Sequence, residues 1–205
     1  MTQDLAFIHR FEKGVSPQAP LLLLHGTGGN ENDLMDLGRA LSVDRSLLSP
    51  RGQVLENGMP RFFRRLAEGV FDEADVIKRA HELADFILAA CKTHDLKMPL
   101  AVGFSNGANI AAAMLFLRPE VLSGAVLLRA MVPLKSPPPT DLDHKPVLLI
   151  SGAADPIILA SNAKQLAAML KTANAGIQHE TLPTGHNLTQ NDVTLAKTWL
   201  NKHGA

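Results

Sequence analysis

A pentapeptide, Gly-Phe-Ser-Asn-Gly at residues 103–107, constrains this chain more than any other stretch. It follows a short apolar run at residues 99–102 that is typical of a strand, and it opens an apolar run of helical length at residues 108–117. A serine on a sharp strand-to-helix turn needs glycine two residues before and after it, because only glycine lets the neighbouring chain pass that close. The turn also places Ser105 at a helix N-terminus, where free N–H groups favour a developing negative charge. The pattern predicts a nucleophile elbow; a serine that merely caps the helix is the alternative.

Apolar strand-like runs alternate with segments of helical periodicity along the rest of the chain. We expect strands near residues 6–11, at a sheet edge, and at 21–24, 46–49, 124–128, 146–150 and 177–182. We expect helices near residues 33–41, 74–94, 160–172 and 189–202. Asn30 or Asn32 is placed to cap the first helix, and Thr189 with Asp192 has the spacing of a capping box. Unbroken apolar strands between helices predict an α/β fold with a mostly parallel sheet covered on both faces, in a single domain over residues 1–205.

Two further segments carry local predictions. Residues 53–72 look irregular, and a loop of that length inside a compact domain is usually functional or disordered. Its aromatic and methionine side chains argue against disorder, so we expect a folded loop at the rim of the active site. Cys91 falls on the apolar stripe of the helix at residues 74–94, which predicts a buried structural thiol and not a reactive one.

Composition excludes several classes of protein. Lys+Arg and Asp+Glu both number 20, and a chain built to hold nucleic acid needs a basic excess. No apolar segment reaches the roughly 18 residues of a membrane span, and no signal peptide is visible. The single cysteine forms no internal disulfide and rules out a cysteine-based zinc framework. We therefore expect a cytoplasmic protein with no nucleic-acid partner, no membrane span and no metal.

A serine hydroxyl needs a base within hydrogen-bond reach and a group that orients this base. In the fold predicted here, the chain order is serine, then an acid, then histidine. Asp155 directly follows the strand at residues 146–150, and His186 lies between Gly185 and the last helix. The carboxyl ends of parallel strands collect functional groups, so Ser105, Asp155 and His186 are predicted to converge.

Other acids and histidines that follow the serine are less well placed. His144 precedes a strand and therefore lies at the wrong end of the sheet, His179 lies within a strand, and His203 lies in the tail. Asp141 and Asp143 are alternative acids, but they also precede their strand.

The oxyanion of an acyl-transfer reaction needs two backbone donors. One is predicted to be the N–H of Asn106, the residue after the nucleophile. The other should come from the loop after the second strand, His-Gly-Thr-Gly-Gly at residues 25–29, with Thr27 the first choice and Gly28 the second. A phosphate-binding loop is the weaker reading, because no complete G-x-G-x-x-G or Walker motif is present.

With these residues in place, the chain resembles the alpha/beta-hydrolase superfamily. Its motifs are most similar to the small bacterial carboxylesterase/phospholipase group, which is related to acyl-protein thioesterases and dienelactone hydrolases. They lie at residues 24–34, 49–52, 103–107, 152–156 and 185–186. The resemblance implies a triad of Ser105, Asp155 and His186 with an oxyanion hole of the Thr27 and Asn106 N–H groups. It also implies a carboxylesterase acting on a small-molecule ester, without a cofactor, and often a homodimer. Dienelactone hydrolases carry Cys at the elbow position where this chain carries Ser105, so the chain resembles them less than it resembles the carboxylesterases.

The substrate is less constrained by the sequence. Four apolar side chains are candidates for an acyl or aryl pocket, with plain core residues as the alternative: Met59, Phe62, Phe63 and Met131. Arg51 and Arg61 are candidates for binding an anionic group, although salt-bridged surface arginines are the favoured reading. A thioesterase or a lysophospholipase is the alternative enzyme, and a non-catalytic ligand-binding protein on a hydrolase fold is the alternative from another class.

Overall fold

Most of the described strands of this protein assemble into one central sheet. The computed structural model describes residues 6–203. Within that range seven strands form a sheet in the order β1-β3-β2-β8-β9-β10-β11. Their bounds are β1 His9–Glu12, β2 Leu21–Leu24, β3 Leu47–Pro50, β8 Leu100–Phe104, β9 Gly124–Leu128, β10 Pro146–Gly152 and β11 Gly176–Leu182. Only the edge pair β1–β3 is antiparallel among the described strands of this sheet, so the predicted mostly parallel sheet with an edge strand at the N-terminal side is confirmed.

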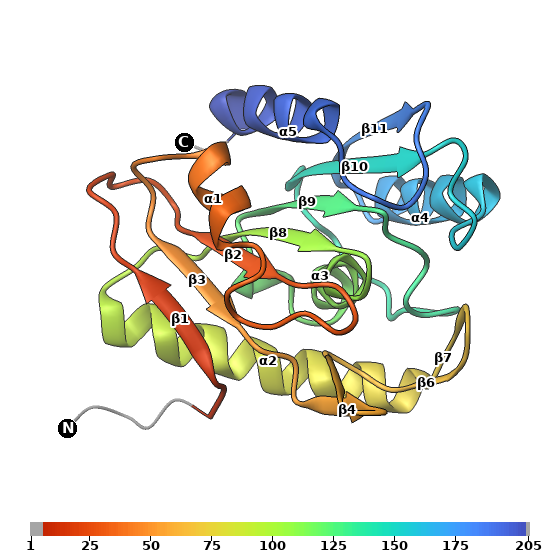
Figure 1. Ribbon diagram of the computed structural model, residues 1–205, viewed down its shortest axis with the longest axis horizontal. Coiled ribbons are helices and arrows are strands. Elements are labelled where there is room, and N and C mark those ends of the chain that lie inside the picture. The colour runs from red at the N-terminus through yellow and green to blue at the C-terminus, as the bar shows by residue number, and fades with distance from the viewer. Residues whose placement is uncertain (1–5, 204–205) are drawn as a thin grey trace.

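Helices cover both faces of the sheet (Figure 1). They are α1 Met35–Leu41, α2 Glu73–His94, α3 Asn106–Leu117, α4 Ala160–Thr172 and α5 Gln190–His203. Leu21 and Leu23 of β2 pack in one cluster with α1 and α5, whereas Leu22 and Leu24 pack in the other with α2, α3 and α4. Both faces of this strand are therefore buried, which explains its unbroken run of leucines. None of the helices within residues 6–203 has the length and apolar character needed to cross a bilayer.

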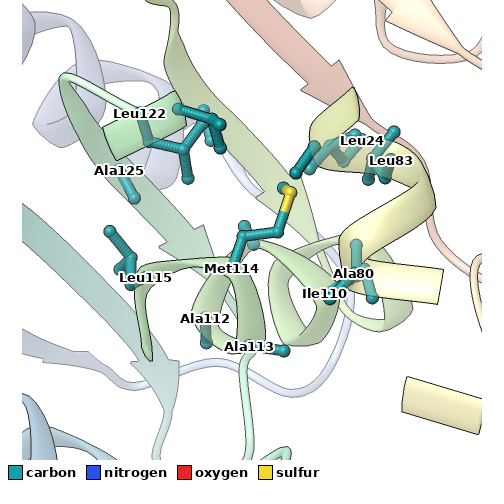
Figure 2. Packing of buried hydrophobic residues seen from close by; sticks show 14 of the residues in the cluster. Leu24, Ala80, Leu83, Ile110, Ala112, Ala113, Met114, Leu115, Leu122 and Ala125 are labelled. Carbon is teal, nitrogen blue, oxygen red and sulfur yellow. The ribbon is translucent and has the colours of Figure 1, made fainter. Parts of the chain in front are cut away.

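Helix α3 is buried from Asn106 to Phe116. Its many alanines let neighbouring elements come close, and its larger side chains fill the remaining space. Figure 2 shows Met114 of α3 in the buried cluster that also holds Leu83 of α2 and Leu24 of β2. Packing from several sides holds the helix that follows the elbow, and this fixes where the elbow leaves the sheet.

The predicted cap of the first helix is wrong. Helix α1 begins at Met35, and Leu34 at its N-cap makes no side-chain capping bond. Asn30 Oδ1 instead accepts a hydrogen bond from the N–H of Asn32 at 2.9 Å. Asparagine side chains readily bond the backbone two residues on, and here that local turn takes the place of the cap.

Residues 53–72 are not irregular, contrary to the prediction. They form two hairpins, β4 Val54–Glu56 with β5 Met59–Arg61, and β6 Arg65–Ala67 with β7 Val70–Phe71. Asn57 and Gly58 both have positive φ, at 51° and 80°, as a two-residue hairpin turn requires. The Asn-Gly pair is the sequence signal that would have found the first hairpin. Between β3 and α2 the described chain carries these two hairpins and no lid domain.

Candidate active site

Ser105 lies on a strained turn between β8 and α3. Its φ of 51° and ψ of −114° are unusual for a residue with a side chain. A Cβ at Gly103 would lie 2.6 Å from the Gly107 carbonyl oxygen, and one at Gly107 would lie 2.0 Å from the Leu24 carbonyl oxygen. Both glycines are therefore required by close backbone approach, as predicted. The Ser105 side chain makes no helix-capping bond, so the capping alternative does not describe this serine.

Ser105, His186 and Asp155 form one chain of hydrogen bonds. The distance from Ser105 Oγ to His186 Nε2 is 3.0 Å, and that from His186 Nδ1 to Asp155 Oδ2 is 2.8 Å. The Asp155 side chain is 1% exposed, whereas that of His186 is 16% exposed. Three segments that are far apart in the sequence thus meet at the carboxyl ends of β8, β10 and β11. The arrangement joins a hydroxyl, an imidazole and a carboxylate in the order needed to activate the hydroxyl.

The environment of Asp155 keeps its carboxylate ionised. Burial on its own would raise its pKa, but hydrogen bonds from the Ile158 N–H, the His186 ring and the Ile157 N–H bring the pKa below its ordinary value. The two backbone donors lie 3.0 Å and 2.8 Å from Asp155 Oδ1. One oxygen is therefore held by the backbone, which leaves Oδ2 to orient His186.

The other candidate acids and histidines are not brought to Ser105. His179 Nε2 lies 2.7 Å from Ser151 Oγ, in a second serine–histidine pair away from the elbow. His144 precedes β10, and Asp141 binds the Asp143 N–H and the Asn174 side chain.

The loop after β2 is held by a buried histidine. His25 is 1% exposed, with Nδ1 2.7 Å from the Gly26 carbonyl oxygen, and its Nε2 accepts a hydrogen bond from the Gly52 N–H at 3.0 Å. Because Nε2 accepts, the ring is neutral and carries its proton on Nδ1. Gly28 donates its N–H to the Pro60 carbonyl oxygen at 2.9 Å. Among the described residues no hydrogen bond occupies the Thr27 N–H, so Thr27 is the better placed of the two candidate donors.

A small cavity of about 40 Å³ lies beside Ser105. It is lined by Thr27, Arg61, Arg65, Glu68, Gly69, Phe71, Ser105, Asn106, Asn109, Met131, Ile157 and Ile158. Of the four apolar pocket candidates, only Met131 is among these lining residues. Phe62 and Phe63 are buried in the core, and Met59 is 40% exposed beside Gly28. No group of three or more His, Cys, Asp or Glu within residues 6–203 is arranged to hold a metal ion.

The two arginine candidates have different environments. Arg51 forms a two-pronged ion pair with Glu31, at 2.5 Å and 2.8 Å, as the favoured reading predicted. Arg61 is only 3% exposed, so the prediction of a surface arginine is wrong for this residue. The buried-thiol prediction for Cys91 is confirmed, and burial raises its pKa to about 11.

A buried arginine that the sequence did not predict binds the chain on both sides of the candidate base, His186. Arg129 is fully buried at the end of β9, and its guanidinium donates to the carbonyl oxygens of Gly185 at 3.0 Å and Asn187 at 3.2 Å. Its partner carboxylate, Asp192, lies at 2.7 Å and 3.1 Å. Asp192 in turn accepts the Thr189 N–H at 2.8 Å, which confirms one half of the predicted capping box. The network ties the residues on both sides of His186 to β9 and to the start of α5.

An elbow on a mostly parallel sheet with helices on both faces defines the class of alpha/beta hydrolases. A family model described as phospholipase/carboxylesterase matches residues 8–204. MhqD of Bacillus subtilis (strain 168), a hydrolase by name, is 47% identical over 193 residues, which cover 93% of this chain and 96% of MhqD. The chain belongs to the phospholipase/carboxylesterase family, and this membership makes it a carboxylic ester hydrolase.

Solved structures agree with this assignment. The carboxylesterase of Bacillus cereus is 45% identical with a TM-score of 0.95, covering 98% of this chain and 96% of that one. The carboxylesterase of Mesorhizobium loti is 31% identical with a TM-score of 0.92, covering 97% and 96%.

The Arg129 network leads to a prediction about stability. Replacing Arg129 with Met leaves the Asp192 carboxylate buried without its cation, and we expect the free energy of unfolding to fall by about 3–5 kcal/mol. Urea unfolding monitored by circular dichroism measures the change. Arg39→Met, which breaks an exposed ion pair with Glu12, should stay near the wild-type value. An Arg129→Met protein as stable as Arg39→Met would contradict the prediction.

The burial of His25 leads to a prediction about pH. Burial lowers the pKa of His25 in the folded protein, while the unfolded chain titrates near its ordinary value of about 6.5. Unfolding below that pH takes up a proton that the folded state lacks, so the free energy of unfolding should fall as pH drops from 7.5 to 5.5. One such group contributes at most about 1.4 kcal/mol per pH unit.

His25→Asn removes the titrating ring but keeps a donor for the Gly26 carbonyl, so urea melts across this range should show a shallower pH dependence. His94 and His179, whose pKa values burial also lowers, should contribute to the slope that remains. An unchanged slope in His25→Asn would show that His25 does not carry this proton uptake.

Proposed function

We propose that this protein is a serine carboxylesterase that hydrolyses esters of short acyl groups through an acyl-enzyme on Ser105. The observation that supports it most is the hydrogen-bonded chain from Ser105 Oγ through His186 to Asp155, with its distances of 3.0 Å and 2.8 Å. The family membership agrees with this chemistry.

In the first step, His186 Nε2 takes the proton of Ser105 as Oγ forms a bond to the ester carbonyl carbon. The carbonyl π electrons move to oxygen, and the resulting oxyanion is stabilised by the N–H groups of Thr27 and Asn106. Asp155 remains an ionised carboxylate and stabilises the imidazolium. Collapse of the intermediate breaks the bond to the leaving alkoxide, which receives the proton from His186.

Water then releases the acyl group. His186 takes a proton from water, the hydroxide oxygen bonds to the acyl carbon, and the same two N–H groups stabilise the second oxyanion. The bond to Ser105 Oγ breaks, His186 returns the proton to the serine, and the carboxylic acid leaves.

The size of the cavity supports a short acyl group. It measures about 40 Å³, a few times the space that one water molecule needs and far less than an ordinary ligand pocket. Met131, Phe71, Ile157 and Ile158 supply apolar surface on its walls, which suits a small alkyl group.

Replacing Ser105 with Ala removes the nucleophile, and we expect kcat for p-nitrophenyl acetate to fall by about 10⁴-fold or more. Ser151→Ala, which removes the other serine–histidine pair, is the matched control and should keep wild-type activity. A fluorophosphonate probe should label wild type and Ser151→Ala but not Ser105→Ala. Near wild-type hydrolysis by Ser105→Ala would exclude the mechanism, and absence of labelling in folded wild type would favour a non-catalytic binding protein.

The dependence of activity on acyl chain length should distinguish a short-acyl carboxylesterase from a thioesterase or a lysophospholipase. We expect kcat/KM to be highest for acetyl or propionyl p-nitrophenyl esters and to be at least about tenfold lower for the octanoyl ester, because a filled pocket rejects added methylenes. A parallel series of thioesters and lysophospholipids completes the comparison. Highest activity on octanoyl or longer substrates would contradict the short-acyl proposal and favour a thioesterase or a lysophospholipase.

A further inference from the structure

Three consecutive residues at the end of the first hairpin and just after it, Pro60, Arg61 and Phe62, bind both loops that supply the proposed oxyanion donors. The Pro60 carbonyl oxygen accepts the N–H of Gly28 at 2.9 Å, and Arg61 Nη1 donates to Thr27 Oγ1 at 2.9 Å. On the other side, the N–H of Phe62 donates to Asn106 Oδ1 at 2.7 Å. We call residues 60–62 the strut, because they connect the loop after β2 to the elbow.

Arg61 is the central residue of the strut and is buried in the hairpin. Besides Thr27, its guanidinium donates through Nε to the Phe63 carbonyl oxygen at 3.2 Å and lies 3.3 Å from Glu56 Oε2. A guanidinium that is 3% exposed costs free energy unless its donors are paired. The contact with Thr27 links a buried, well-held cation to the loop that carries the proposed donor.

The loop after β2 needs hydrogen bonds from another segment to fix its conformation. Gly26, Gly28 and Gly29 surround Thr27, and glycine leaves the backbone more conformations than any other residue. The strut holds this loop twice, through the Gly28 N–H and through the Thr27 hydroxyl. With the Gly28 N–H bonded to Pro60, the Thr27 N–H remains as the donor for substrate.

The strut also fixes the other donor. Asn106 is 2% exposed, and the Phe62 N–H binds its side-chain oxygen while no hydrogen bond reaches its Nδ2 within the described residues. The side chain of Asn106 is thus anchored to the strut, while its own N–H belongs to the first turn of α3, where backbone N–H groups have no partner within the helix.

We propose that Arg61 is a positioning residue for the oxyanion hole. Through Thr27 Oγ1 it holds the Thr27 N–H at the distance from the Asn106 N–H that the developing oxyanion requires. The inference rests on the esterase mechanism proposed above and assigns to Arg61 an effect on the transition state and not on substrate binding. Arg61 also lines the cavity, so direct binding of an anionic substrate group is the competing role.

The test compares four variants in hydrolysis of p-nitrophenyl acetate. Arg61→Gln and Thr27→Val both remove the contact between the guanidinium and the hydroxyl, whereas Thr27→Ser keeps the hydroxyl. The fourth is the double variant Arg61→Gln/Thr27→Val. We expect kcat to fall about 10- to 100-fold in Arg61→Gln and in Thr27→Val, with KM within about threefold of wild type, because a displaced donor weakens binding of the transition state.

Thr27→Ser should retain most of the activity. The double variant should be no slower than Arg61→Gln, because both substitutions break the same interaction. Arg118→Gln, which removes ion pairs with Asp85 and Glu120, is the control for loss of a partly buried arginine and should keep wild-type kcat.

Several results would overturn the inference. One is an unchanged kcat in Thr27→Val. Another is a double variant whose loss of kcat equals the product of the two single losses. The third is a rise in KM with unchanged kcat in Arg61→Gln. If Arg61→Gln does not fold, the comparison of Thr27→Val with Thr27→Ser still decides. Failure of the proposed esterase mechanism would be recognised by a different result. In that case wild type would hydrolyse p-nitrophenyl acetate no faster than Ser105→Ala.

Discussion

The contact between the elbow and strand β2 is the constraint on which the rest of the structure depends. Gly107 comes so close to the Leu24 carbonyl that no side chain fits between them. Because β2 and β8 are parallel neighbours, this contact also places the loop after β2 beside Ser105. The turn at Ser105 carries strain of about 1–3 kcal/mol, which the burial of α3 on all sides offsets. The result is a hydroxyl that lies beside the two proposed backbone donors.

Two buried arginines then stabilise the loops around that hydroxyl. Arg129 binds carbonyl oxygens on both sides of His186 and forms an ion pair with Asp192, while Arg61 binds the Thr27 hydroxyl. Loops are the most mobile parts of a fold, and a guanidinium can bind several of their oxygens at once from a fixed position. Buried charge therefore supports the geometry of the site, although neither arginine belongs to the proposed triad.

Most of the fold could be predicted because its signals are local. Strands buried on both faces read as unbroken apolar runs, and α2 shows its buried stripe, so β2, β9 and the helix bounds follow from periodicity. Long-range pairing could not be read in this way. Arg129 and Asp192 are 63 residues apart, and Arg61 lies in a basic stretch that looks exposed, so their burial depends on partners that periodicity does not reveal.

What the sequence determined by itself is the order of elements and the identity of Ser105, Asp155 and His186 as candidates, because each follows a predicted strand and parallel strands end at one edge. Only the tertiary structure decided which N–H of the loop after β2 remains free, which arginines are buried and how small the cavity is. These properties arise from contacts between segments that are distant in the chain. The hairpin at residues 54–61 illustrates the difference. Its turn could be predicted from Asn57 and Gly58, but the hydrogen bond from Arg61 to Thr27 could not.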